Sequence, residues 1–278
     1  MTNASSLHYI SEGFSILNLK SYHWIVVNSS AGKDSQCMLD YVVEQCDKAR
    51  VLRHRLVVVH ADLGRVEWPG TRELAEEQAR HYGLEFIAVS RPQGDLLEHI
   101  EQRGMFPSPS VRWCTSDHKR GPVMTVFTRL ANHSRQESVR VCRILSCMGM
   151  RAQESPARAK RLPFSRNGMA SNGRRRVDDW LPIHGWDVEQ VWSRIRASGV
   201  RYHPAYDLGM PRLSCCFCIF SPRSALLLAG KHNPELLAQY VEAERKIKHR
   251  FRLELPLAEI QQALENGEEP GPVHDWVM

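Results

Sequence analysis

The feature that most constrains the fold is a strand-like run that passes directly into a helix through a short polar turn. Trp24–Asn28 is apolar and β-branched, Ser29–Ser35 is small and hydroxyl-rich with one Lys and one Asp, and a helical pattern runs from Lys33 to Gln45. Such a turn points several backbone N–H groups at one place, with the positive end of the helix dipole behind them. The sequence therefore predicts a phosphate site, and with it a nucleotide ligand.

The rest of the chain places this turn in an α/β fold. Strand-length apolar runs alternate with helix-length amphipathic stretches, which predicts a parallel sheet with helices on both faces. The strand runs are Trp24–Asn28, Leu56–His60, Glu85–Val89 and Val139–Leu145, and the helical stretches are Lys33 to Gln45, Thr71 to Tyr82 and Ser116 to Ala131. Ligands of such sheets bind beyond the carboxyl ends of the strands. Asp62, Gly149 and Arg151 follow predicted strands and are therefore candidate nucleotide contacts.

Positive charge is concentrated in one segment. The chain has a formal charge of +6, and residues 151–176 hold eight Arg and Lys against the single acid Glu154. Residues 155–179 lack periodicity and are predicted to be a basic mobile loop. This loop separates a nucleotide-binding domain, 1–154, from a mostly helical, cysteine-containing unit, 180–278. The loop is interpreted either as a solvated surface or as a contact for nucleic acid through Arg151–Arg176.

The eight cysteines fall into two groups. Four lie within apolar or helical patterns and are expected to be small core residues: Cys37, Cys46, Cys142 and Cys147. The other four are candidate metal ligands: Cys114, Cys215, Cys216 and Cys218. Thiolate sets of this kind bind an iron–sulfur cluster or Zn²⁺, and unligated thiols are the third alternative. Adjacent cysteines rarely bind one metal ion, so the roles of Cys215 and Cys216 stay open.

Several segments resemble one family. The turn Ser30–Ser35 resembles the Ser-Gly-Gly-Lys-Asp-Ser pyrophosphate loop (PP-loop) of the ATP pyrophosphatases, in the branch that includes the phosphoadenosine phosphosulfate (PAPS) reductases, with Ala31 in place of the first Gly. Three further segments are similar: Asp62-x-Gly64, Gly149-x-Arg151-x-x-Glu154-Ser155, and Trp113-Cys114-Thr115 paired with Arg212-x-x-Cys215-x-x-Cys218. The resemblance implies a Rossmann-like fold of the adenine nucleotide alpha hydrolase type.

The resemblance also implies roles for individual residues. Ser29, Ser30, Ala31, Gly32, Lys33, Asp34 and Ser35 would surround the nucleotide together with Asp62, Gly149 and Arg151. Lys33, Asp34 and Arg151 are the expected catalytic residues, and Glu154 is placed to orient Arg151. Cys114, Cys215 and Cys218 would surround one site, which is expected to hold a 4Fe–4S cluster with Cys216 as a possible fourth ligand.

Two reactions divide this family. Sulfonucleotide reductases attack PAPS with a cysteine of a C-terminal tail, whereas ATP pyrophosphatases adenylylate a substrate and let sulfur displace AMP. No cysteine follows Cys218 in this sequence, so we expect the second reaction, with ATP and Mg²⁺, of the kind seen in DNA phosphorothioation and tRNA thiolation. A PAPS reductase and a non-catalytic nucleotide-binding subunit are the alternatives, and the Cβ of Ala31 near the phosphates favours the latter slightly.

Composition sets the expected surroundings of the protein. The sequence has no apolar run of bilayer length and no signal-peptide pattern near Met1, which predicts a cytoplasmic protein without membrane contact. The expected partners are the nucleotide substrate, nucleic acid as sulfur acceptor and a cysteine desulfurase as sulfur donor. The sequence does not predict an oligomeric state.

Overall fold

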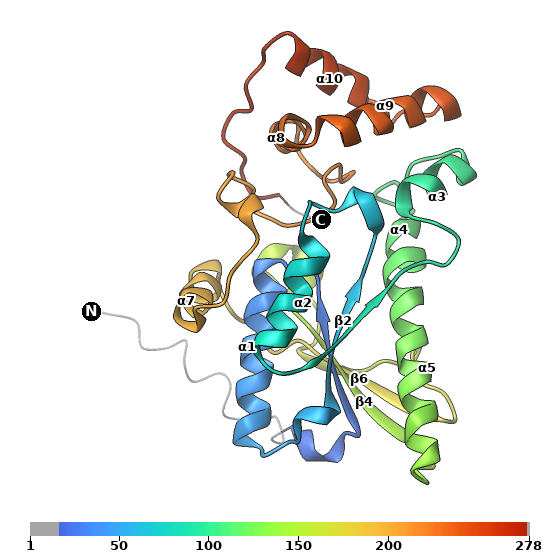
Figure 1. Ribbon diagram of the computed structural model, residues 1–278, viewed down its shortest axis with the longest axis vertical. Helices are drawn as coiled ribbons and strands as arrows, with labels where there is room; N and C mark the ends of the chain where they lie inside the picture. The colour runs from blue at the N-terminus through green and yellow to red at the C-terminus, as the bar shows by residue number, and fades with distance from the viewer. Residues whose placement is uncertain (1–16, 277–278) are drawn as a thin grey trace.

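The computed structural model describes residues 17–276 and contains a six-stranded sheet with helices on both faces (Figure 1). The strands are β1 (Trp24–Ser29), β2 (Leu56–Ala61), β3 (Glu85–Val89), β4 (Cys142–Met148), β5 (Phe164–Arg166) and β6 (Arg175–Trp180). Their order is β3-β2-β1-β4-β6-β5, and every neighbouring pair is parallel except β5 and β6. The predicted α/β fold with a parallel sheet is confirmed.

The helices connect and cover these strands. They are α1 (Lys33–Lys48), α2 (Thr71–His81), α3 (Leu96–Arg103), α4 (Trp113–Thr115), α5 (Gly121–Gln136), α6 (Pro156–Ala159), α7 (Val188–Ser198), α8 (Arg223–His232), α9 (Pro234–Ile247) and α10 (Leu257–Glu265). Shorter helical turns are η1 (Leu19–Ser21), η2 (Arg53–Arg55), η3 (Gly64–Val66), the π-helical η4 (Ser116–Arg120), η5 (Ala152–Glu154) and η6 (Pro204–Tyr206). The predicted helix 116–131 therefore begins as a π-turn, and Pro122 lies where this turn passes into α5.

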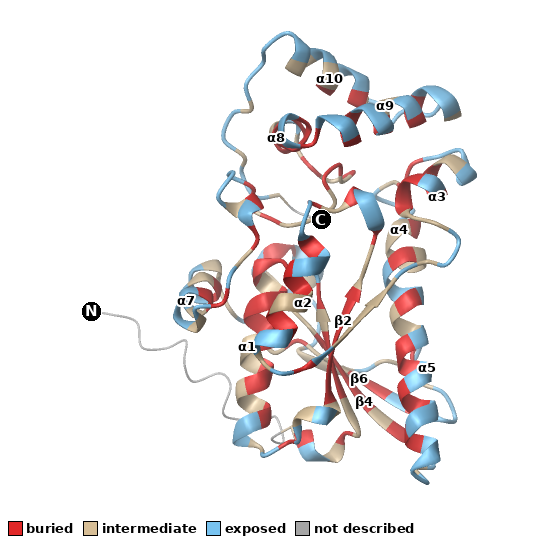
Figure 2. Cartoon of the chain, viewed as in Figure 1, coloured by how far each residue is buried: buried red, intermediate tan, exposed pale blue. Residues whose placement is uncertain are grey.

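Alternating side chains of β1 bury both faces of the sheet. Ile25 and Val27 belong to a core with α1, whereas Val26 packs with residues of α5 on the opposite face. All three side chains are fully buried. This arrangement explains why the strand lacks the polar alternation of a half-exposed strand. Figure 2 shows the same pattern, with buried residues along the strands and on the inner faces of the helices.

The strand order creates a switch point beside the phosphate turn. The chain adds β2 and β3 on one side of β1 and then returns to place β4 on the other side. In the two ladders, Ser29 pairs with His60 and Asn28 pairs with Met148. The loops that follow these three strands consequently open at one edge of the sheet, where ligands of this architecture bind.

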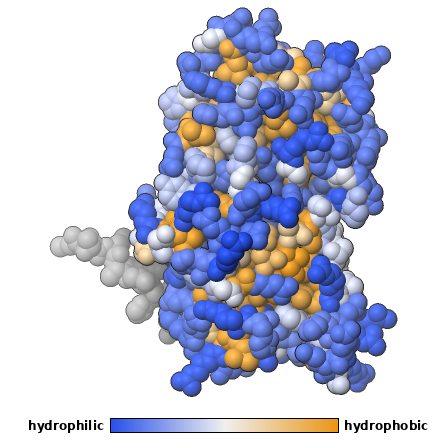
Figure 3. All heavy atoms as spheres, viewed as in Figure 1, coloured by the Kyte–Doolittle hydropathy of each residue, from blue (hydrophilic) through white to orange (hydrophobic). Residues whose placement is uncertain are grey.

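Helices α8, α9 and α10 form a unit beyond the carboxyl ends of the strands (Figure 1). Its apolar core includes Leu226 of α8, Tyr240 of α9 and Ile260 of α10, and it continues into Val66 and Trp68 after β2. Hydrophilic residues cover most of the face seen in Figure 3, and hydrophobic residues gather near its middle. Within residues 17–276, no helix is both long enough and apolar enough to span a bilayer.

The expectation of a mobile loop over 155–179 is wrong for three stretches, because α6, β5 and most of β6 lie within it. The sequence of β6 is polar, yet its buried side chains have partners elsewhere in the chain. The Tyr22 hydroxyl donates to Asp178 at 2.9 Å, and the Asn167 amide donates to Asp179 at 3.1 Å. Burial is the main cause that raises the pKa of Asp179. The division into units 1–154 and 180–278 stays a prediction.

Candidate functional site

The phosphate turn is a tight loop held by its own hydroxyl groups. The Ser30 N–H donates to the Ser35 hydroxyl at 3.1 Å, and that hydroxyl donates to the Gly32 carbonyl at 2.9 Å. Ser29 accepts the Ala31 N–H through its hydroxyl at 3.2 Å. These bonds fix the loop before any ligand arrives, so the free N–H groups at the start of α1 are preorganised for an anion.

Ala31 adopts the left-handed backbone conformation that glycine favours, with φ at +55°. Its side chain is fully buried in a small apolar cluster with Leu74 and Ala75 of α2. The methyl group that replaces the glycine hydrogen therefore packs against α2. The expectation that Ala31 favours a non-catalytic protein stays a prediction.

Gly149 lies in close contact with the first turn of α1. A Cβ at this position would lie 2.6 Å from the Asp34 carbonyl oxygen and 2.8 Å from the Ser35 nitrogen. Both are backbone atoms, which cannot move away as the end of a flexible side chain can. The glycine after β4 thus allows that loop to touch the phosphate loop.

We expect Gly149→Ala to lower the free energy of unfolding by about 1–3 kcal/mol, because the added methyl group overpacks a backbone contact. Urea unfolding followed by circular dichroism measures the change. Gly168→Ala is the matched control, since nothing lies within 4 Å of a Cβ at that position. Equal stability of the two variants would contradict the close contact.

Asp34 forms ion pairs with two cations, Lys33 and Arg151, at the start of α1. Its Oδ1 accepts the Arg151 Nε–H at 2.6 Å, and its Oδ2 lies 3.4 Å from the Lys33 Nζ. Arg151 is only 2% exposed and Lys33 only 3%. The three expected catalytic residues therefore meet in one buried group of net positive charge, which suits a polyphosphate.

Glu154 was expected to orient the side chain of Arg151, but it contacts the backbone of that residue instead. Its carboxylate accepts the backbone N–H of Arg151 at 2.8 Å and ion-pairs with Arg158 and, at 2.6 Å, with Arg212. The guanidinium of Arg151 is held instead by Asp34 and by Gln153, whose Oε1 lies 2.5 Å away. Glu154 thus orients the main chain of this loop, and Asp34 orients the Arg151 side chain.

Residues of the 203–213 segment, which sequence reasoning missed, cover the phosphate loop. The Tyr206 hydroxyl accepts the Lys33 backbone N–H at 2.7 Å, and the Pro211 carbonyl accepts the Lys33 Nζ at 2.9 Å. Burial is the main cause that raises the pKa of Tyr206, so its hydroxyl stays neutral. A cleft of about 500 Å³ lies beside Tyr206 and is lined also by Arg151 and Trp192.

Asp62 lies just beyond β2, at the same edge of the sheet. Its Oδ1 accepts the Gly64 N–H at 2.8 Å, and its Oδ2 faces Arg72 at 3.5 Å. The side chain is 20% exposed, so it is accessible from the loop side of the sheet. The structure therefore places Asp62, Gly149, Arg151 and the phosphate loop after the neighbouring strands β1, β2 and β4.

Three of the four candidate metal ligands gather in one place. Cys114 is near enough to Cys215 and to Cys218 to raise the pKa of each thiol, and the charge of Lys119 lowers the pKa of both. Burial is the main cause that raises the pKa of each of these two thiols. Cys216 is 1% exposed, and burial raises its pKa to about 12.

The surroundings of Cys216 differ from those of the other three cysteines. Cys216 is a buried member of the apolar core that includes α8, α9 and α10, whereas Cys114, Cys215 and Cys218 are only partly buried. Cys216 therefore differs from Cys114, Cys215 and Cys218 in its burial. The choice between Cys215 and Cys216 as a metal ligand stays a prediction.

Comparison with known proteins identifies one family model, the phosphoadenosine phosphosulfate reductase domain, which matches residues 24–221. No curated protein matches the chain. A solved structure with a similar fold is the PAPS reductase of Candida auris in a phosphate complex, with 18% identity, a TM-score of 0.47, and coverage of 69% of this chain and 80% of that one.

Two further solved structures extend the comparison. One is the FMN adenylyltransferase of Candida glabrata with FAD and pyrophosphate, at 14% identity and a TM-score of 0.45, covering 69% of this chain and 54% of that one. The other is the U34-tRNA thiolase of Methanococcus maripaludis with its 4Fe–4S cluster, at 15% identity and a TM-score of 0.43, covering 90% of this chain and 75% of that one.

Proposed function

The chain belongs to the phosphoadenosine phosphosulfate reductase domain family, and from this premise we propose that it is an ATP pyrophosphatase that activates a substrate for sulfur transfer. The observation that carries the proposal is the group around Asp34, where the side chains of Lys33 and Arg151 meet at the N-terminus of α1. A triphosphate is the nucleotide group best matched to two buried cations, a helix N-terminus and the Ser30 and Ser35 hydroxyls.

Each residue then has a specific task. Lys33, Ser30 and Ser35 hold the β and γ phosphates, and Arg151 neutralises the charge that develops at the α phosphate. Asp34 keeps Lys33 and Arg151 in fixed positions, so their charges are oriented before the reaction begins. Mg²⁺ bound with ATP would add the usual neutralisation of phosphate charge in such a displacement.

The cysteine group fits an iron–sulfur cluster better than a single zinc ion. Tetrahedral Zn²⁺ with Zn–S bonds of about 2.3 Å holds its sulfurs about 3.8 Å apart. The sulfurs of Cys114, Cys215 and Cys218 do not all lie within 4.8 Å of one another. A cluster binds each thiolate through a different iron and so accepts wider spacing.

We therefore assign Cys114, Cys215 and Cys218 as cluster ligands and leave Cys216 outside the set. When bound, a cluster with three cysteine ligands would supply one iron position for a sulfur donor. Lys119 and Arg112, which act on the thiol of Cys218, would offset the negative charge of the thiolates.

Nucleic acid is the proposed sulfur acceptor, and a cysteine desulfurase is the proposed donor. Arg151 and Arg175 are buried, so fewer cations of the basic segment reach the surface than its composition indicates. The exposed cations are Lys160, Arg161, Arg166, Arg174 and Arg176, on or near β5 and β6. They form a basic edge that suits contact with phosphate groups, independent of base sequence.

A product assay tests the proposed reaction. With Mg²⁺, ATP, a sulfide source and either total tRNA or DNA, we expect AMP and pyrophosphate in equal amounts, measured by anion-exchange chromatography. The alternative activity is assayed in parallel, with PAPS and reduced thioredoxin. Sulfite formed from PAPS, without pyrophosphate formed from ATP, would show that the chain is a sulfonucleotide reductase.

A further inference from the structure

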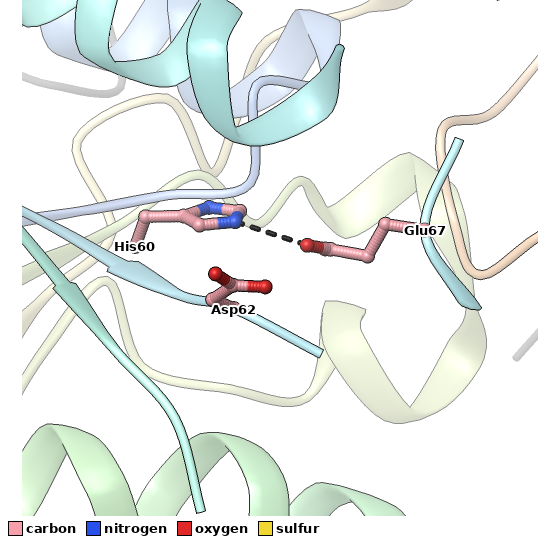
Figure 4. A group of neighbouring side chains, drawn as sticks. All are labelled: His60, Asp62 and Glu67. Atoms are coloured by element: carbon pink, nitrogen blue, oxygen red, sulfur yellow. Dashed lines mark hydrogen bonds and ion pairs between the residues drawn. The ribbon is translucent and has the colours of Figure 1, made fainter. Parts of the chain in front are cut away.

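A group of three potential metal ligands lies at the end of β2, outside the cysteine group. His60 is the last residue but one of β2, Asp62 follows the strand, and the turn η3 brings Glu67 back toward them (Figure 4). One donor atom from each residue lies within 4.8 Å of the other two, the only such group of His, Cys, Asp and Glu among residues 17–276. His60 is 1% exposed, and the side chain of Glu67 is 15% exposed.

The hydrogen bonds of His60 fix which ring nitrogen faces this group. Its Nδ1 lies 3.0 Å from the Ser29 carbonyl, which can only accept, so Nδ1 carries a proton. Its Nε2 lies 3.1 Å from Oε2 of Glu67. In the neutral ring Nε2 is an acceptor, as is the carboxylate, so a positive species must stand between them.

We propose that His60, Asp62 and Glu67 bind a divalent first-row transition-metal ion. With bonds of about 2.1 Å, two ligands at a right angle are about 3.0 Å apart and opposite ligands about 4.2 Å apart, which the spacing of this group permits. One imidazole with two carboxylates suits Mn²⁺, Fe²⁺ or Zn²⁺ better than Mg²⁺. The Ser29 carbonyl accepts the Nδ1–H of His60 and so fixes the orientation of the imidazole, as hydrogen-bond partners of metal-binding histidines do.

The ion would lie between the phosphate loop and the cysteine group. Ser29 ends the strand that leads into the phosphate loop, and Glu67 forms a β-bridge with Cys215. Three protein ligands leave coordination positions open, as in catalytic rather than structural metal sites. The ion would therefore be exposed to a ligand bound between the phosphate loop and the cysteine group.

A protonated His60 paired with Glu67 is the competing explanation. Burial lowers the pKa of His60, but the hydrogen bond and charge of Glu67 outweigh burial, so the pKa is raised overall. In that case the positive species is a proton, and no ion binds. The two explanations differ in whether the chain takes up a metal ion at neutral pH.

Mn²⁺ is the probe for this test, because it prefers oxygen and nitrogen ligands to thiolates. The full chain, without nucleotide, is titrated with Mn²⁺, and free Mn²⁺ is measured by electron paramagnetic resonance. We expect one tight equivalent in the wild type and at least tenfold weaker binding in both Glu67→Gln and Asp62→Asn. Glu73→Gln, an exposed acid of α2, is the control and should bind as the wild type does.

Three comparisons make the result decisive. Circular dichroism confirms that the variants are folded, and the two isosteric changes give independent measurements. Cys114→Ser should bind Mn²⁺ normally, which excludes the Cys114 thiol as a ligand. Absence of bound Mn²⁺ in the wild type, or unchanged affinity in both Glu67→Gln and Asp62→Asn, would overturn the metal site. Neither ATP nor turnover enters the assay, so its outcome is separate from that of the proposed reaction.

Discussion

Lys33→Ala is expected to lower the rate of pyrophosphate release from ATP by about 100- to 1,000-fold, the effect of removing one preorganised charge from a phosphate site. The side chain is 3% exposed and lies 3.4 Å from Asp34, so no water or neighbouring lysine replaces its charge easily. Single-turnover kinetics at saturating ATP measure the chemical step directly. Equilibrium dialysis with labelled ATP measures binding separately.

The controls for this variant come from the same helix. Lys48→Ala removes an exposed lysine at the far end of α1 and should leave the rate unchanged. Because Lys33 also donates to the Pro211 carbonyl, thermal unfolding is recorded to detect any loosening of the 203–213 segment. A wild-type protein that binds ATP without releasing pyrophosphate would be a nucleotide-binding subunit. Unchanged turnover in Lys33→Ala would remove Lys33 from the catalytic group.

The phosphate loop and four of the five parallel strands could be predicted because their signals are local. Because β1 and β2 are buried on both faces, their sequences are nearly continuous apolar runs. The polar turn that follows β1 ends its apolar run abruptly. Gly149 and Arg151 were identified by their place after a strand. The sheet topology then brings these separate loops to one edge, as parallel strands require.

The elements that were missed depend on partners distant in sequence. Strand β6 contains Asp178, which is buried and accepts a hydrogen bond from Tyr22, 156 positions earlier. Tyr206 and Pro211 contact Lys33 across more than 170 positions. No rule of sequence spacing applies to such pairs. The sequence therefore predicts irregular coil both for β6, which joins the sheet, and for the 203–213 segment, which covers the phosphate loop.

The deeper burial of Cys216 than of the other three thiols leads to the sharpest prediction about the cofactor. After anaerobic purification, Cys114→Ser and Cys218→Ser are expected to lose nearly all bound iron and the visible absorbance of an iron–sulfur cluster, because each removes one of three ligands. Cys216→Ser should retain both, since its thiol is buried in the apolar core and is not one of the three proposed ligands. Iron and acid-labile sulfide analysis, with absorption spectra, measures the outcome.

Cys142→Ser is the control that separates loss of a ligand from general damage to the core. Cys142 is buried in the sheet, and its thiol lies 3.4 Å from the Ser134 hydroxyl, which can also bond a serine at that position. Iron retained in Cys114→Ser, or lost equally in Cys216→Ser, would contradict the assignment of three ligands. Stoichiometric zinc in place of iron would require the three sulfurs to move closer together than they lie in this structure, because one tetrahedral ion binds all of its ligands at a single centre.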